Sequence, residues 1–597
     1  MKQFFKMLLA VVCGIILANI LVIFIFAGIV GAAAGSTTGK GTTVLPRSGV
    51  LAIDLSEIII TEQDQPEDPL AMLQGQMQIP VGLWKAVRAI NIAAADPGVK
   101  YIYLKADGST TGISTLGELR KALENFRLSG KPVIAWTENP GAGVFYISSV
   151  ADKIYMSEYQ GANGGLVGIA SQSFYLKDLL DKAGVNMQLI RHGKYKSAGE
   201  MFVRNSPSEE NKEQNERMVA SLWETVGGTI AEGRNIPLEK LDRMVENIEL
   251  CLPEDYLAAG LVDGVFSRDS LKRRLASLAV VDDFRDLQFI PFADYANAKV
   301  VPNFRSRNKI AVLYADGEIV DGNDLQNVAG DRFANEIDKI RADKGIKAVV
   351  LRVNSPGGSV LASEKIKSEI ELLRKDKPVV ASYGNYAASG GYWISNSCDK
   401  IFSDATTLTG SIGVFSMIPD LSKTIRDIAH VNMVTVSSNK HADMYGLTSP
   451  LSPEETAYMQ ASVENIYSRF VSTVSEGRDL EPDFVDSIAQ GRVWAGSDAL
   501  KIGLVDEIGT LEDAVKWAAA AGGNPDLAGW NVAEYPKPKT EMEMLMSMFG
   551  QKTPDENIFS GTPFGDAAGQ LLDWYARIKK NPADVMFARI PYLIDIR

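Results

Sequence analysis

The chain has 597 residues, of which 46% are hydrophobic and 23% are charged, and its formal net charge is −13. This length exceeds what one hydrophobic core organises and predicts several domains or a duplicated one, within an otherwise ordinary globular composition. The negative charge, without any basic stretch interleaved with aromatic residues, argues against nucleic acid as a partner.

The first 34 residues predict a membrane anchor. Lys2 and Lys6 precede an uncharged apolar run over residues 7–34. A bilayer core needs about 20 such residues, whereas a secretory signal has an apolar core of about 7–15. We therefore expect one transmembrane helix within residues 1–34, with a signal peptide cleaved after Ala32-Ala33-Ala34 as the alternative. The two lysines place the N-terminus in the cytoplasm and the body outside it, which in a bacterium is the periplasmic side of the inner membrane.

After a Gly/Thr-rich linker over residues 35–46, the chain contains the same series of segments twice. Apolar runs at Gly49–Asp54 and Lys309–Tyr314 begin the two copies. Further matched pairs follow in the same order: 100–106 with 347–353, 131–135 with 377–381, 165–169 with 410–414, and 260–263 with 503–506. Matched order over some two hundred residues indicates a tandem duplication, with copies at 47–302 and 303–535.

Short apolar strands alternate with helical stretches in both copies, for example at 117–128 and 362–373. This alternation predicts an α/β fold. The tail over residues 536–597 is different, because Met- and Leu-bearing helical stretches make it amphipathic. It would pack on the body, on another subunit or at the membrane surface.

One motif occurs in both copies, and each copy has lost a different part of it. Residues 388–395 (ASGGYWIS) align without a gap to residues 141–148 (GAGVFYIS), which places Ala142 opposite Ser389. A second pair of segments aligns further along, beginning at Val185-Asn186-Met187 and at Val431-Asn432-Met433. In this alignment Lys196 corresponds to Ala442. A serine is kept in one copy and a lysine in the other, which predicts one active site assembled from both.

The residues around Ser389 and Lys196 suit nucleophilic catalysis. Ser389 follows a strand and precedes a helical stretch, and Gly357-Gly358 upstream can turn backbone N–H groups toward a developing oxyanion. Lys196 can act as the base only when neutral, and burial between two packed copies would lower its pKa from ~10.4 toward 7. Ser411 can hydrogen-bond the neutral amine and direct it toward Ser389.

Other interpretations of these residues stay open. A lone Ser-Gly-Gly is usually a turn, a lone lysine is usually solvated, and His192 is a competing base four residues before Lys196. Cys251 and Cys398 could form a disulfide, although two buried thiols are favoured. The spacing of Cys and His suggests no metal site, and the chemistry requires no cofactor.

The motifs NSPGGS (354–359), AASGGYW (387–393), TGSIGV (409–414) and YKSA (195–198) closely resemble those of the signal peptide peptidase A family in its long, duplicated form. The resemblance covers roughly residues 47–530 and the N-terminal anchor. It implies a Clp-protease/crotonase-like fold and a Ser/Lys hydrolase that cuts signal-peptide remnants. It also implies a homotetramer seated on the membrane.

At matching positions, the resemblance implies Ser389 as nucleophile and Lys196 as general base, with Ser411 holding the lysine. It implies oxyanion donors at Gly390 and at either Gly357 or Gly358. Two rival functions remain: a crotonase-like acyl-CoA enzyme with a similar oxyanion hole, and an anchored, non-catalytic scaffold that binds peptides.

Overall fold

The computed structural model describes residues 45–66, 78–159, 165–537 and 586–589. The predicted membrane span and the helical stretches of the tail lie outside these ranges. Within them, no helix is long and apolar enough to cross a membrane.

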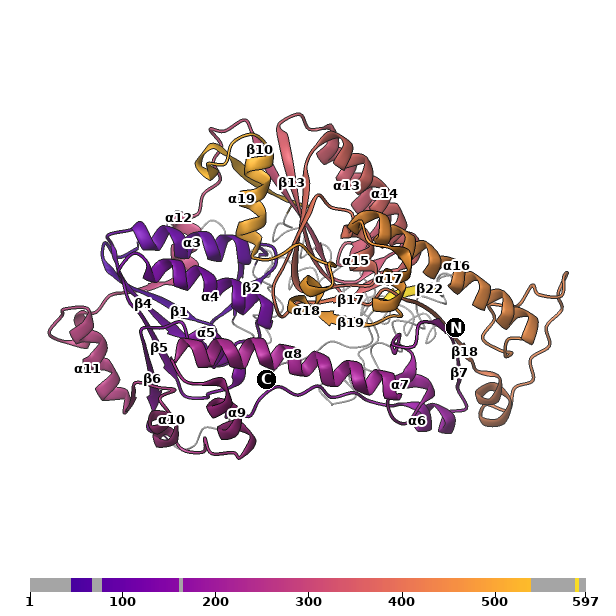
Figure 1. Ribbon diagram of the computed structural model, residues 1–597, viewed down its shortest axis with the longest axis horizontal. Coiled ribbons are helices and arrows are strands. Elements are labelled where there is room, and N and C mark those ends of the chain that lie inside the picture. Colours follow the sequence, from indigo (N-terminus) through magenta and orange to yellow (C-terminus); the bar gives the residue numbers. More distant parts are fainter. Residues whose placement is uncertain (1–44, 67–77, 160–164, 538–585, 590–597) are drawn as a thin grey trace, which may run out of the picture.

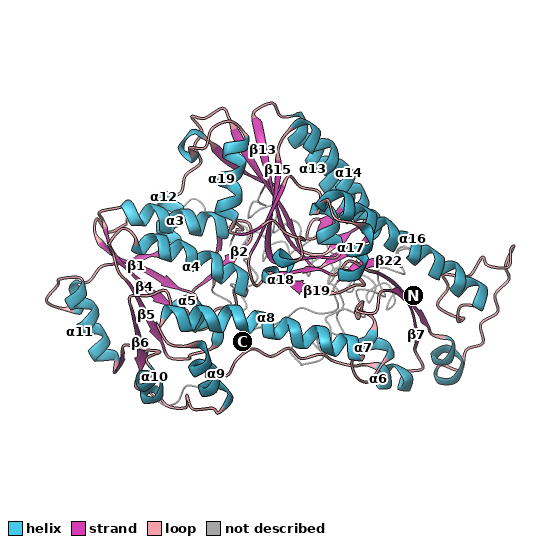
Figure 2. Cartoon of the chain, in the orientation of Figure 1, coloured by secondary structure: helices cyan, strands magenta, loops and turns pink. Residues whose placement is uncertain are grey.

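The first repeat is built on a parallel six-stranded sheet. Its strands, in spatial order, are β9 (Phe289–Pro291), β1 (Gly49–Asp54), β4 (Val99–Lys105), β5 (Val133–Thr137), β6 (Lys153–Ser157) and β8 (Gly264–Phe266). The helices that accompany them are α3 (Leu83–Ala95), α4 (Ile113–Arg127), α5 (Ala142–Ser148), α9 (Leu238–Glu246), α10 (Pro253–Ala259), α11 (Arg268–Leu278) and α12 (Phe292–Lys299). A short parallel pair, β2 (Ile58–Thr61) and β3 (Ile79–Gly82), contacts α3, and β2 is seen near the end of this helix in Figure 2.

The second repeat has the same strand order, which confirms the duplication predicted from the sequence. Its corresponding strands are β21 (Asn531–Tyr535), β10 (Lys309–Asp316), β13 (Ile346–Ser355), β15 (Val379–Ala388), β16 (Lys400–Ser403) and β20 (Glu507–Ile508). In addition, β17 (Leu408–Gly410) pairs with the end of β15, and β19 (Val493–Ala495) pairs with β17. The helices are α13 (Gly330–Ala342), α14 (Val360–Asp376), α15 (Gly390–Ser395), α16 (Pro453–Arg478), α17 (Pro482–Ile488), α18 (Gly496–Lys501) and α19 (Leu511–Ala521).

A third sheet joins the two repeats. Its order is β12 (Val328–Ala329), β11 (Ile319–Val320), β14 (Gly357–Ser359), β22 (Met586–Arg589), β18 (Val414–Asp420) and β7 (Asn186–His192). β7 belongs to the first repeat by sequence, yet it pairs antiparallel with β18 of the second. The short helices α6 (Lys177–Lys182) and α7 (Glu200–Val203) flank β7, and the long α8 (Glu209–Gly233) then runs back to the first repeat (Figure 1).

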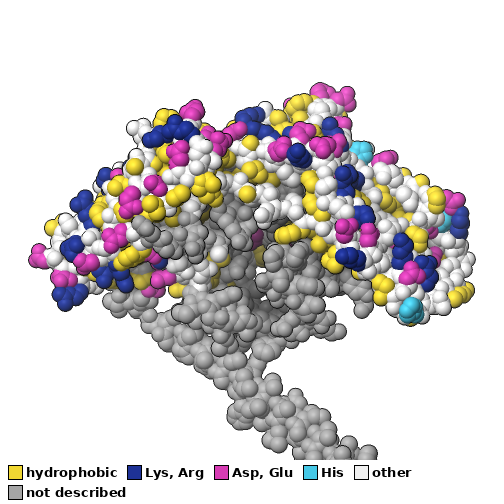
Figure 3. All heavy atoms as spheres, turned by 90° about the horizontal axis from the view of Figure 1, so that it is seen from below, with side chains coloured by type: hydrophobic (Ala, Val, Ile, Leu, Met, Phe, Trp, Pro, Cys, Tyr) yellow, Lys and Arg dark blue, Asp and Glu magenta, His cyan; other side chains and the backbone are white. Residues whose placement is uncertain are grey.

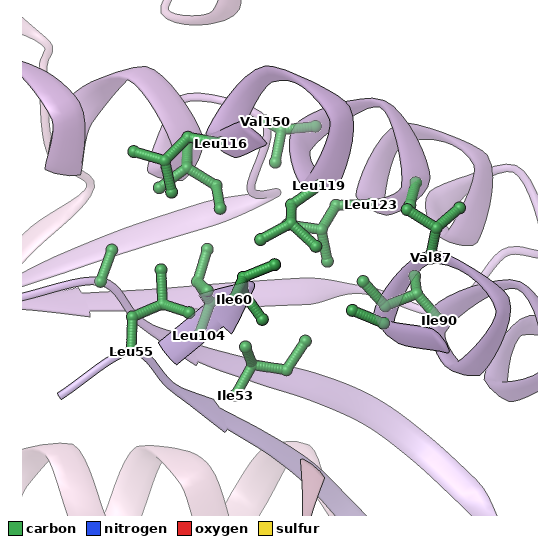
Figure 4. Packing of buried hydrophobic residues seen from close by; sticks show 14 of the residues in the cluster. Ile53, Leu55, Ile60, Val87, Ile90, Leu104, Leu116, Leu119, Leu123 and Val150 are labelled. Carbon is green, nitrogen blue, oxygen red and sulfur yellow. The ribbon is translucent and has the colours of Figure 1, made fainter. Parts of the chain in front are cut away.

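Alternating apolar residues on strands and helices form a core that continues from one repeat into the other. Within the first repeat, α3 and α4 pack on β1 and β4 through side chains such as Ile53, Leu104 and Leu119 (Figure 4). The same apolar cluster includes Val312 and Val350 on the second sheet and the buried face of α19. The other face of the second sheet packs separately against α13, α14 and α16.

Buried ion pairs also cross between the repeats. Arg352 on β13 lies 2.7 Å from Glu62, which follows β2, and 2.7 Å from Glu118 on α4. All three side chains are buried, and burial raises the pKa of Glu118 to about 7 although the charge of Arg352 opposes this shift. At the surface, by contrast, basic and acidic side chains are interspersed over the face seen in Figure 3.

The predicted α/β class is confirmed, and the helical stretches predicted at 117–128 and 362–373 correspond to α4 and α14. The expectation of two buried thiols is wrong in part. Both Cys251 and Cys398 are free, but only Cys398 is buried, because Cys251 lies on an exposed turn before α10. The predicted boundary at residues 302–303 falls in the connection between α12 and β10.

Candidate active site

Ser389 lies between the carboxyl end of β15 and the first turn of α15. Its φ of 55° and ψ of −113° are values that residues other than glycine rarely adopt, with a strain of about 1–3 kcal/mol. The turn is fixed by two backbone hydrogen bonds, from Ser389 N to Gly410 O (2.8 Å) and from Trp393 N to Ser389 O (2.7 Å). A tight strand-to-helix turn of this kind presents a serine hydroxyl at the edge of the sheet.

Ser411 reaches the same place from the neighbouring strand. β15 and β17 are parallel, and Ala388 pairs with Gly410. Ser389 and Ser411 each follow one of these paired residues, so both leave the carboxyl ends of adjacent strands, where α/β folds gather their functional groups.

Lys196 arrives from the first repeat through the pairing of β7 with β18. His192 pairs with Val414 in this antiparallel ladder, so the residues after His192 lie beside those before Val414. The register therefore brings Lys196 next to Ser411. A backbone hydrogen bond from Tyr195 N to Gln490 O (2.9 Å) holds the turn that carries the lysine.

The Lys196 amine contacts both serines. Its Nζ lies 2.9 Å from Ser389 Oγ, 3.1 Å from Ser411 Oγ and 3.2 Å from Ser411 O. A neutral amine has two N–H donors and one lone pair, which these three oxygens satisfy when Ser389 donates its proton and Ser411 accepts twice. All three residues are 0% exposed, and burial holds the pKa of Lys196 well below its usual value of 10.5.

The charge of the carboxylate nearest to Lys196 in sequence, that of Glu200, is compensated by other groups. Glu200 forms an ion pair with Arg191 (2.9 Å) and accepts a hydrogen bond from Ser208 Oγ (2.7 Å). Although burial acts in the opposite direction, these hydrogen bonds hold the pKa of Glu200 below its usual range. Its charge is therefore satisfied within the first repeat, and burial remains the cause of the shift at Lys196.

Two glycines of the second repeat give the lysine its space. A Cβ on Gly491 would lie 2.5 Å from Lys196 Cβ, and a Cβ on Gly413 would lie 3.1 Å from Lys196 Cδ. Gly491 also has a φ of +81°, which favours glycine. Sequence reasoning assigned Gly413 no role and missed Gly491, because the contact joins residues far apart in the chain.

The glycines predicted as oxyanion donors lie together beside Ser389. A Cβ on Gly390 would come within 3.2 Å of Gly358 N, so a side chain there would obstruct this cradle. The N–H of Gly357 is already engaged, because it donates to Ser355 Oγ at 3.2 Å. In the first repeat, Ala142 stands at the N-terminus of α5 in place of the serine.

A segment of the C-terminal tail lies between the two strands that flank the site. β22 pairs antiparallel with β14, with Gly358 opposite Ala588, and antiparallel with β18, with Phe415 opposite Phe587. Arg589 also forms an ion pair with Glu318 (3.4 Å). Of the three places expected for the tail, residues 586–589 thus occupy the first, on the body itself.

His192, the competing base, faces elsewhere. Its ring stacks on Tyr467 with a centroid separation of 3.9 Å, whereas the amine beside Ser389 Oγ is that of Lys196. The structure thus brings together Ser389, Lys196, Ser411 and the glycine cradle.

Comparison with known proteins identifies the family. A family model described as Peptidase family S49 matches residues 125–282 and 371–523, one stretch in each repeat. Protease 4 of Haemophilus influenzae is 37% identical over 81% of this chain and 80% of its own length. Protease 4 of Salmonella typhi is 36% identical over 88% of this chain and 87% of its own length. A chloroplastic serine protease SPPA of Arabidopsis thaliana is 30% identical over 77% of this chain and 68% of its own length. These relatives confirm the resemblance drawn from the motifs, and the chain belongs to peptidase family S49.

Proposed function

We propose that this peptidase is a membrane-anchored serine endopeptidase with a Ser389/Lys196 dyad, which degrades apolar peptides such as cleaved signal peptides. The observation that carries the proposal is the 2.9 Å contact between a fully buried lysine amine and a serine hydroxyl on a strained turn. The duplicated α/β body is, on this proposal, Clp-protease/crotonase-like. The uncharged run over residues 7–34 supports the anchor and a periplasmic body.

The reaction follows from the contacts. Ser389 Oγ attacks the scissile carbonyl while neutral Lys196 takes its proton, a role worth about 10²–10⁴ in rate. The N–H groups of Gly390 and Gly358 stabilise the oxyanion. Of the two neighbouring glycines we assign this role to Gly358, because the N–H of Gly357 already donates to Ser355 Oγ. Lys196 then protonates the leaving amine and later activates the water that releases the acyl group from Ser389. Ser411 keeps the amine directed at Ser389 throughout.

The substrate backbone would bind as an extended strand between β14 and β18. The support is β22, since residues 586–589 already pair with both strands there. Main-chain pairing of this kind accepts many sequences. The apolar preference agrees with β18, whose Phe415 and Met417 belong to an apolar cluster with Ala198 and Phe202.

We also propose that copies of this chain assemble head to tail. The family resemblance implies that four copies form the assembly. In the first repeat, the segment from Val185 to Lys196 leaves its own domain and pairs with β18. Its counterpart in the second repeat, residues 431–443, projects at one end of the molecule beyond α16 (Figure 1). This segment exposes a run of apolar side chains: Val431, Met433, Val434 and Val436.

The internal symmetry identifies what this projecting segment would bind. The counterpart of β18 in the first repeat is residues 169–175, which form no strand with the residues that the structure describes. Pairing of residues 431–443 with residues 169–175 of a second copy would repeat the contact made inside each chain. A head-to-tail contact of this kind closes into a ring when the rotation allows, and exposed apolar patches mark such interfaces.

Substitutions at the dyad test the catalytic proposal. In the full-length chain, Ser389→Ala abolishes both hydrolysis of an apolar peptide ester and labelling by a fluorophosphonate, because the nucleophile is lost. Lys196→Ala lowers kcat by about 10²–10⁴-fold. His192→Phe, which keeps the stacking on Tyr467, retains activity. Normal cleavage by Lys196→Ala would refute the dyad, unlabelled wild type would favour the scaffold, and turnover of an acyl-CoA thioester would favour the crotonase-like alternative.

The pH dependence of labelling tests the state of the amine. Because only neutral Lys196 accepts the Ser389 proton, the labelling rate rises with pH through the lowered pKa of Lys196 and levels off well below 10.5. The measurement is the fluorophosphonate rate constant from pH 5 to 11, with Lys196→Arg as an inactive control. An inflection near 10.5 would mean that the amine is solvated in the working enzyme.

Removal of residues 586–597 tests the place of the substrate. A peptide that pairs with β14 and β18 must displace β22, so the truncated chain should show a higher kcat/KM. Loss of a competitor worth one or two kcal/mol corresponds to a rise of about 5–30-fold. Removal of residues 590–597 alone is the matched control, because it keeps β22. Equal kcat/KM for both truncations would show that the substrate binds elsewhere.

Two charged substitutions in the projecting segment test the assembly. Val434→Asp with Val436→Asp should reduce the mass in detergent, measured by light scattering, from the oligomer to the single chain. Labelling of Ser389 should persist, since both dyad residues belong to one chain. Val280→Asp is the control, because Val280 is equally apolar and exposed but lies in the first repeat after α11. An unchanged mass for the double variant would exclude this interface.

A further inference from the structure

The strand that carries Ser389 is bulged just before the nucleophile. Val353 pairs with Tyr383 and Ser355 pairs with Ala387, so Asn354 alone on β13 faces Gly384, Asn385 and Tyr386 on β15. The side chain of Asn354 fills the gap, since its Oδ1 accepts a hydrogen bond from Tyr386 N (3.2 Å). Bulges beside active sites re-aim the residues that follow them.

The bulge directs the side chain of Asn385 toward the first repeat. Its Oδ1 accepts a hydrogen bond from Ser114 N (3.1 Å), and its Nδ2 donates to Thr115 Oγ1 (3.1 Å). Ser114 is the second residue of α4, a position whose N–H is normally bound by the side chain of the helix's own N-cap. The N-cap of α4 is Gly112, which has no side chain to offer. Asn385 therefore caps a helix of the other repeat.

Comparison of the repeats shows that the first repeat has lost the cap that the second repeat keeps. The counterpart of Gly112 in the second repeat is Ser359, whose Oγ accepts a hydrogen bond from Ala362 N (3.3 Å) and caps its own helix α14. In the first repeat, a Cβ on Gly112 would lie 2.3 Å from Asn385 Oδ1. The glycine removes the local cap and makes room for the one supplied by β15.

This contact completes a closed path between the two dyad residues. From Lys196 the chain continues through α7 into α8, which packs on α5 of the first repeat, and α5 packs on α4. Asn385 then joins α4 to β15, and Ser389 follows the last residue of this strand. Without the cap, the bulge is held to the first repeat by fewer directional bonds.

We propose that Asn385 is a positioning residue, which fixes the β15 bulge against α4 and thereby sets Ser389 at the correct distance from Lys196. This inference rests on the proposed function and adds a residue to it that touches neither the substrate nor the dyad. It also assigns a role to the start of α4 in the first repeat, where Ser114 and Thr115 bind the side chain of Asn385.

The first test is a pair of substitutions at Asn385 in the full-length chain. Asn385→Ala should lower kcat for an apolar peptide ester by about 10²-fold, as expected for misplacement of a reacting group by about 1 Å. KM should change little, since Asn385 lies off the substrate strand. Asn385→Asp should restore most of kcat, because its carboxylate accepts from Ser114 N and suits the positive end of α4. Rates are divided by the amount of folded protein, determined from thermal unfolding.

The second test separates positioning from helix stability. Gly112→Ser gives α4 its own cap, as Ser359 does for α14, but its Cβ displaces the Asn385 amide toward the adjoining cavity of about 180 Å³. The expected result is an unchanged Tm with kcat lowered as in Asn385→Ala. Gly228→Ala in α8 is the control, since nothing lies within 4 Å of the added Cβ.

The outcomes are distinct. The inference would be overturned if Gly112→Ser kept the wild-type kcat, or if Asn385→Ala lowered Tm without lowering kcat. In either case Asn385 would only stabilise α4, and the proposed dyad would be unaffected. Wild type that neither hydrolyses the ester nor labels at Ser389 would overturn the proposed function and this inference with it.

Discussion

A lysine amine stays neutral beside a serine hydroxyl only where water is excluded, and the packing between the two repeats excludes water from Lys196. Lys196 follows β7 of the first repeat, which pairs with β18 of the second in the joining sheet, and its side chain is fully buried there. Gly491 and Gly413 close over its backbone and its side chain. The unfolded chain would protonate this amine below a pH of about 10.4, so the folded protein gives up stability at neutral pH to keep the amine unprotonated.

The duplication explains how one chain meets this demand. Ser389 lies at a strand end of the second repeat, and the first copy of the fold supplies β7, which pairs with β18 and brings Lys196 to that strand end. On the proposed mechanism the base comes from one repeat and the hydroxyl from the other, and the corresponding positions of the opposite repeats hold Ala442 and Ala142. The caps of α14 and α4 follow the same pattern, because the second repeat caps its own helix with Ser359 and also caps α4 of the first repeat with Asn385.

The sequence predicted a large part of this arrangement, and the rest depended on contacts that a linear pattern does not contain. Matched runs identified the repeats, the complementary losses in the two copies identified Ser389 and Lys196 as candidates, and Ser411 was predicted as the hydroxyl that directs the amine. The role of Gly491 is set by the path of a backbone distant in sequence. The β15 bulge adds residues that no periodicity signals, and the pairing of β22 depends on a short segment after a long tail. Cys251 was misjudged because composition alone favours buried thiols.

The proposed substrate fits the same constraint that shapes the dyad. A peptide in the place of β22 would lie across Gly358 and alongside β18, and so would cover the approach to Ser389 and Lys196 at the moment of reaction. Apolar side chains would keep that space dry, whereas a charged side chain nearby would favour the protonated amine or bring water with it. A preference for apolar, extended peptides then follows from the base itself, because a lysine that works only when desolvated selects for substrates that keep it so.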